Sequence, residues 1–102
     1  MASAPPTEYI EAALLPLMPR FWDNARQELQ HMQQALAVHD WATLRRLAHG
    51  HKGAAAGFGL TGLAAIAKTL EQAARPQTAE TAQLHLQHLA QYMETVRVLE
   101  RK

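Results

Sequence analysis

Apolar residues recur every three or four positions through most of this 102-residue chain, and this spacing constrains its fold more than any other feature. Residues spaced in this way lie on one face of an α-helix, and that face must be buried against another element. Proline and glycine are few and lie mostly between the periodic stretches, where helices end. The pattern therefore indicates an all-α fold with short connections.

Four long helices are predicted from this periodicity. The first begins at Pro19, Asp40 is the expected N-cap of the second, and Thr78 is the expected N-cap of the last. Four such helices joined by short loops pack most simply as an antiparallel up-and-down four-helix bundle. The expected ranges are 19–38, 41–56, 61–74 and 78–101.

The N-terminal part is expected to add a short extra helix to this bundle. Residues 1–6 resemble a flexible lead-in, and residues 7–102 are expected to form one domain, since the chain is too short for two. Thr7 can cap a helix that continues to about Leu15 and is ended by Pro16 and Pro19. We expect this helix to cover one end of the bundle.

Composition excludes several classes of function. The net charge is +1 and the isoelectric point is about 8.2, so no strong field favours binding to nucleic acid or to an anionic membrane. The chain has no cysteine, which excludes disulfides and thiolate chemistry and fits a reducing compartment. No segment approaches the roughly 20 apolar residues of a membrane span. We therefore expect a cytoplasmic protein.

The second predicted helix carries the chemistry-bearing residues. Neighbours three and four positions away share a helix face, so His49 lies with Arg45, Arg46, Lys52 and Gly53. The His49 imidazole is therefore expected in solvent, among three cations. The apolar stripe lies on the other side and consists of Leu44, Leu47, Ala48, His51 and Ala55.

Two glycines surround this histidine inside the helix. Gly50 and Gly53 each cost about 1 kcal/mol relative to alanine, which a purely structural helix would rarely accept. Gly53 removes the side chain that would crowd the imidazole and would let the backbone of a partner approach. The alternative is a tolerated glycine pair near a helix end, because Gly57 and Gly59 follow closely.

These residues resemble a known signalling family. The segment Leu47-Ala48-His49-Gly50-His51-Lys52-Gly53, followed by Gly59, resembles the pattern Ala-His-x-Leu-Lys-Gly and downstream Gly of histidine phosphotransfer (HPt) domains. Leu70-Glu71 resembles the Leu-Glu or Leu-Gln of the next helix in that family, and the helical layout is similar from about Pro16 onward.

One departure is His51, where the family usually has an apolar residue. His49 and His51 lie about 200° apart around a helix, so both cannot face one partner. Because His51 falls on the apolar stripe, we expect it to be partly buried and hydrogen-bonded. The phosphoryl group is therefore assigned to His49.

The resemblance implies a carrier that relays a phosphoryl group between aspartates of receiver domains, which belong to a hybrid histidine kinase and a response regulator. It implies no ATP-binding kinase activity and no cofactor, with Mg²⁺ supplied by the receiver. A monomer is the family expectation.

The resemblance also implies roles for individual residues. Glu71 would hold Nδ1–H of His49 and leave Nε2 to attack, although a surface ion pair of Glu71 with Lys68 is an alternative. Lys52 would stabilise the phosphohistidine, and nearby cations could extend a positive rim. The expected partner-binding residues are Arg45, Arg46, Gly53, Ala56 and Lys68.

Three other functions are alternatives for this sequence. His85 and His88 lie one helical turn apart, but they supply only two of the three or four ligands that zinc needs, so no metal site is predicted. Nucleic-acid binding is not favoured, because the sequence has no continuous basic stripe. The third is an HPt-like module that docks receivers without transferring phosphate, for which His51 is the only support.

Overall fold

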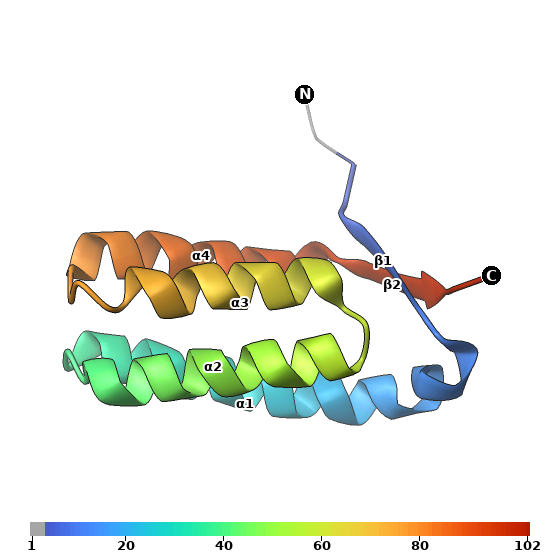
Figure 1. Cartoon of the computed structure of the whole chain (residues 1–102), viewed down its shortest axis with the longest axis horizontal. Helices are drawn as coiled ribbons and strands as arrows, with labels where there is room; N and C mark the ends of the chain where they lie inside the picture. Colours follow the sequence, from blue (N-terminus) through green and yellow to red (C-terminus); the bar gives the residue numbers. More distant parts are fainter. Residues whose placement is uncertain (1–3) are drawn as a thin grey trace.

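The computed structural model describes residues 4–102 and consists mainly of four long helices packed side by side (Figure 1). Each helix packs against its neighbours in the chain, and α1 also packs against α4, which closes the bundle. The chain reverses direction at each short connection between these helices (Figure 1). The four predicted long helices are confirmed, and their bounds are Met18–Ala37 (α1), Trp41–Gly57 (α2), Thr61–Ala73 (α3) and Ala79–Thr95 (α4).

The ends of α2 follow from its local sequence. The Asp40 side chain accepts a hydrogen bond from the backbone N–H of Thr43 at 3.2 Å, as predicted for an N-cap. At the other end Gly59 has a φ of +81°, which lets the Leu60 N–H reach the Ala55 carbonyl oxygen at 2.9 Å. This glycine turn reverses the chain into α3 and so brings the two helices together.

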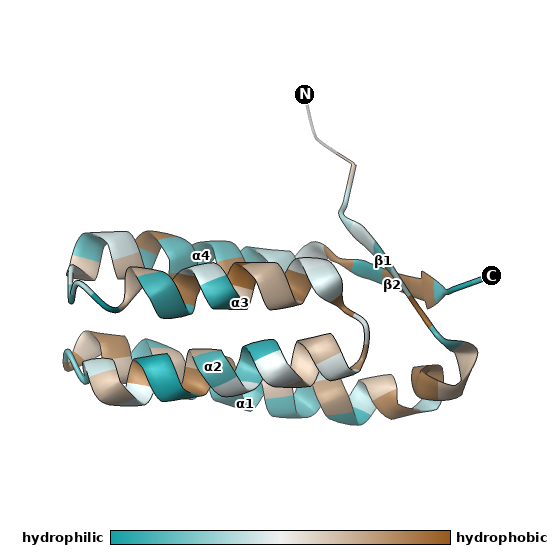
Figure 2. Cartoon of the chain, viewed as in Figure 1, coloured by the Kyte–Doolittle hydropathy of each residue, from teal (hydrophilic) through white to brown (hydrophobic). Residues whose placement is uncertain are grey.

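The buried core lies on the predicted apolar faces of the helices. Figure 2 shows hydrophobic and hydrophilic residues alternating around each ribbon, as amphipathic helices require. Trp22, Leu29, Trp41 and Leu47 are only partly buried and pack at the edge of the core. The buried residues of α2 and α3 are Leu44, Ala48, His51, Ala55, Leu63, Ala67 and Leu70.

The prediction of an N-terminal helix that begins after Thr7 is wrong. Thr7–Ile10 forms a strand (β1) that pairs in parallel with a second strand, Arg97–Glu100 (β2), and a 3₁₀ helix, Ala12–Leu17 (η1), follows. Accordingly α4 ends at Thr95 instead of about Arg101. The burial in β1 alternates, with Glu8 and Ile10 buried, which is the period of a strand.

Two smaller expectations at the ends of the elements also changed. Thr78 lies at the N-cap position of α4 but its side chain makes no capping hydrogen bond. Of the predicted flexible lead-in, residues 1–3 lie outside the described residues, whereas the Pro6 carbonyl oxygen accepts a hydrogen bond from Arg97 N–H at 2.8 Å. The pairing of β1 with β2 thus begins at the end of the predicted lead-in.

A buried glutamate joins this small sheet to the bundle. The Glu8 carboxylate accepts hydrogen bonds from the backbone N–H of Gly62 at 2.9 Å, the N–H of Leu63 at 3.0 Å and the hydroxyl of Tyr92 at 2.7 Å. Leu60, at the N-cap of α3, has no side chain that can cap, so Glu8 satisfies the first N–H groups of α3 instead. Burial, followed by the hydrogen bond and charge of Glu8, raises the pKa of Tyr92, which keeps its hydroxyl a donor.

Glu8→Ala should lower the free energy of unfolding by about 2 to 4 kcal/mol, because two helix N–H groups and a tyrosine hydroxyl lose their acceptor. Urea denaturation followed by circular dichroism measures this change. Glu11→Ala is the matched control, since Glu11 is exposed and makes no capping hydrogen bond. Equal losses in the two variants would contradict the capping role of Glu8.

Candidate functional site

His49 lies on the outer face of α2, where α2 packs against α3. Its side chain is 66% exposed, and its Nδ1 atom lies 2.9 Å from Oε2 of Glu71 on α3. The Glu71 side chain is only 15% exposed, so the bundle surface holds the carboxylate in place. The structure therefore brings together the two residues on which the sequence prediction depended most.

Lys52 completes this cluster from the next turn of α2. Its Nζ atom donates a hydrogen bond to Oε1 of Glu71 at 3.2 Å, so both carboxylate oxygens are bound. The alternative in which Glu71 pairs with Lys68 is wrong: Glu71 pairs with Lys52 and His49, and Lys68 is exposed.

The charge of Glu71 determines which nitrogen of His49 is free. Burial opposes ionisation, but the hydrogen bonds from Lys52 and His49, together with their charges, outweigh it and lower the pKa of Glu71. An ionised carboxylate only accepts hydrogen bonds, so Nδ1 must carry the proton that it donates to Glu71. In the neutral imidazole Nε2 then keeps its lone pair and is the nucleophilic atom.

Arginines form a hollow beside the histidine. The hollow has a volume of about 600 Å³ and is lined by His49, Glu71, Arg45, Arg46 and Arg75. Sequence reasoning missed Arg75, although it is only four residues after Glu71, because its segment was interpreted only as a helix breaker. Lys68, which was predicted to extend the positive rim, does not line this hollow.

The small residues of α2 lie on an open surface. Gly50, Gly53 and Gly57 are exposed, and a Cβ atom added to any of them would meet nothing within 4 Å. Ala56 is exposed on the same helix. The packing of the chain therefore does not require these glycines. Because glycine destabilises a helix relative to alanine, the fold alone does not explain their presence.

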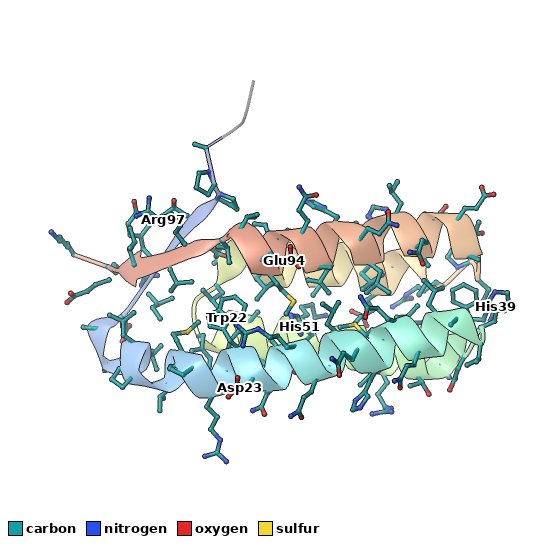
Figure 3. The ribbon with its side chains drawn as sticks, turned by 180° about the vertical axis from the view of Figure 1, so that it is seen from behind. Trp22, Asp23, His39, His51, Glu94 and Arg97 are labelled. Atoms are coloured by element: carbon teal, nitrogen blue, oxygen red, sulfur yellow. The ribbon has the colours of Figure 1, made fainter. Side chains whose placement is uncertain are left out.

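His51 is more deeply buried than the sequence predicted. Its side chain is only 1% exposed and lies between the helices in Figure 3, with no hydrogen-bond partner for Nε2 among the described residues. The nearest carboxylate oxygen, from Glu28, is 3.9 Å from Nδ1, which is too far for a hydrogen bond. The expectation of a partly buried, hydrogen-bonded side chain is thus wrong, because its face of α2 packs into the apolar core.

Burial lowers the pKa of His51 to about 4 from its ordinary value of 6.5. The unfolded chain therefore binds more protons between these two values, and stability should fall as the pH drops through this window. Glu28 is the carboxylate nearest to His51. Burial raises the pKa of Glu28, and the charge of His31 offsets only part of this rise.

His51→Leu should remove this part of the pH dependence. The variant should be as stable as the parent at pH 7 and more stable by up to about 3 kcal/mol at pH 4. At that pH the parent loses stability because protonation of the histidine favours its unfolded chain. Urea denaturation at several pH values compares the two proteins. Parallel stability curves would contradict a buried neutral His51.

Two other site types have no support in residues 4–102. In that part of the chain no three side chains of the His, Cys, Asp and Glu types lie close enough together to hold a metal ion. His85 and His88 lie on α4, where His88 is exposed. No helix in the described part of the chain is both long and apolar enough to span a membrane.

Comparison with known proteins identifies the family. The Hpt domain family matches residues 16–99, which include all four helices and omit β1. No curated protein and no solved structure matches the chain. The matched region contains the exposed histidine of α2 and the α3 carboxylate bound to it. The chain therefore belongs to the Hpt domain family, whose members carry out phosphotransfer in two-component signalling and interact with receiver domains.

Proposed function

We propose that this protein relays a phosphoryl group between aspartates of receiver domains and carries it on Nε2 of His49. The observation that supports this most is the 2.9 Å contact between Nδ1 of the exposed His49 and the Glu71 carboxylate. That contact fixes the tautomer, aims the ring and leaves Nε2 accessible to a partner. The protein would act as a monomeric cytoplasmic carrier without ATP-binding kinase activity.

The transfer step follows from this arrangement. Nε2 attacks the phosphorus of a receiver's aspartyl phosphate, an N–P bond forms, the P–O bond to the aspartate breaks, and the aspartate leaves as a carboxylate. The imidazole becomes positive as Nε2 bonds to phosphorus, and the ionised Glu71 at Nδ1 stabilises that charge. A second receiver takes the group by the reverse step.

Lys52 is placed to neutralise charge during this transfer. Its ammonium lies next to the site because Glu71 holds it at 3.2 Å, and the phosphoryl group brings close to two negative charges. We expect Mg²⁺ to come from the receiver, because among residues 4–102 the hollow is lined by a single carboxylate, Glu71, which is already paired with His49 and Lys52 and cannot alone supply the oxygen ligands of Mg²⁺.

The docking surface would extend from the glycine face of α2 towards α1. Gly53 and Ala56 are exposed there, and an apolar groove lies between the two helices. A receiver seated on this surface could bring its backbone close to His49, which explains glycines that the packing of the chain does not require. The groove is lined by Leu17, Phe21, Ala54 and Phe58, with Arg20, Asn24 and Glu28.

Gly53→Gln should slow transfer from a receiver at least tenfold, because a long side chain one turn from His49 blocks close approach. The free energy of unfolding should stay the same or rise by up to about 1 kcal/mol, since glutamine is the better helix former and the site is open. Stopped-flow or gel-based transfer assays measure the rate. Thr81→Gln, an exposed substitution on α4, is the control, and a Gly53→Gln rate equal to that of this control would refute the steric explanation.

The experiment that tests the proposal uses a receiver domain labelled at its aspartyl phosphate. The labelled receiver is mixed with this protein in Mg²⁺, and the label should pass to the protein in an acid-labile, base-stable form. A second, unlabelled receiver should then accept it. Receivers that bind without passing the label would instead support a docking module. The unusual residue at His51 gives that alternative little support, because His51 is buried.

A further inference from the structure

The arginine hollow beside His49 has more positive charge than its own residues neutralise. Arg45 and Arg46 lie one turn before His49 on α2, and Arg75 lies in the turn that follows α3. Across residues 4–102 the structure has no ion pair that includes any of these arginines. Two of the three, Arg46 and Arg75, are exposed to solvent.

Among the described residues, one carboxylate lines the hollow, and it is already paired. Oε2 of Glu71 is bound to His49 and Oε1 to Lys52, and within residues 4–102 neither oxygen makes an ion pair with a guanidinium. Lys52 itself does not line the hollow. The cations around His49 therefore form two groups: Lys52, which Glu71 partly neutralises, and three arginines that make no ion pair within residues 4–102. Of these arginines, Arg46 also interacts at longer range with the Asp40 carboxylate.

We propose that Arg45, Arg46 and Arg75 form an anion site that holds the phosphoryl oxygens of phospho-His49 after the receiver has left. This inference rests on the proposed function and adds to it a storage site for the carried group. The phosphoryl group carries about 1.5 to 2 negative charges, and guanidinium groups bind its oxygens through paired N–H donors. Arg75 contributes from the turn that follows α3, so the site is lined by residues from α2 and from this turn.

The arginine site also explains how docking and storage can share one histidine. The glycine face, with Gly53 and Ala56, follows His49 along α2, whereas Arg45 and Arg46 precede it. A receiver can therefore contact one side while the arginines retain the phosphoryl oxygens on the other. Holding the charged ground state in this way should slow loss of the phosphoryl group to water.

The test measures the lifetime of phospho-His49 without a receiver. The full chain is phosphorylated chemically with phosphoramidate, the reagent is removed, and the label on His49 is followed by mass spectrometry. Arg75→Ala should shorten the half-life about threefold, as expected for loss of one exposed charge pair, and Arg75→Lys should restore part of it. Arg26→Ala is the control, because Arg26 is exposed on α1 and pairs only with Asp23.

Each outcome decides the inference. An unchanged half-life in Arg75→Ala would overturn it, even if transfer from a receiver became slower, because Arg75 would then belong to protein docking. Failure to label the exposed His49 chemically would also count against it. If the half-life shortens as expected but no receiver passes its phosphoryl group, the anion site stands and the proposed relay fails.

Discussion

His49→Gln should abolish phosphoryl acceptance from receiver domains while the bundle stays folded. Glutamine has no nucleophilic nitrogen, and the side chain it replaces is 66% exposed and packs little against the core. Label transfer from a phosphorylated receiver measures the loss, and thermal unfolding by circular dichroism verifies the fold. We expect the midpoint of unfolding to change by no more than a few degrees.

His88→Gln is the matched control, since it removes an exposed histidine from α4, away from the α2–α3 face. It should accept phosphate like the parent. Continued labelling of His49→Gln, or loss of labelling in His51→Leu, would show that the phosphoryl group has been assigned to the wrong histidine.

Glu71→Ala should slow transfer by up to about a hundredfold, the scale of loss when a reacting group is no longer held in position. Without the carboxylate, Nδ1 has no acceptor, the imidazole can rotate and change tautomer, and Lys52 loses the group that holds it near His49. Rapid-quench measurement of the single-turnover transfer rate tests this prediction.

Glu71→Gln separates positioning from charge. A glutamine oxygen can still accept the hydrogen bond from Nδ1–H, so we expect this variant to stay within about tenfold of the parent. It cannot stabilise the positive imidazole that forms during transfer, which accounts for the remaining loss. Equal rates for Glu71→Ala and the parent would remove Glu71 from the mechanism.

The helices and the exposure of His49 could be predicted from the sequence because they depend on local spacing. Positions three and four apart determine which face of α2 is buried, and this was sufficient to put His49 in solvent. The partnership with Glu71 came from the family resemblance, because no periodicity relates a residue of α2 to one of α3. The structure adds the 2.9 Å contact itself.

The N-terminal strand could not be predicted because its pairing is not local. Thr7–Ile10 becomes a strand only through its register with Arg97–Glu100, at the other end of the chain. A four-residue segment beside a plausible cap fits a helix equally well until that partner is known. Glu8 shows the same effect, since the N–H groups it caps belong to Gly62 and Leu63.

Arg75 and His51 were misjudged for different reasons. Arg75 precedes a proline in a turn. The local sequence therefore predicts the end of a helix, but it does not predict that Arg75 lines the hollow beside His49. His51 was placed correctly on the inward face of α2, but its hydrogen bonding depends on which side chains pack against it from other helices. The Nε2 atom of His51 finds no partner in the described core.

The central claim is that His49 carries the phosphoryl group on Nε2, and nuclear magnetic resonance of the ¹⁵N-labelled protein tests it most directly. After incubation with a phosphorylated receiver and Mg²⁺, the His49 ring should show a ³¹P–¹⁵N coupling at Nε2, with the Nδ1 proton still bound to Glu71. A phosphoryl group on Nδ1, on another histidine or on no histidine would contradict the mechanism derived from the Glu71 contact.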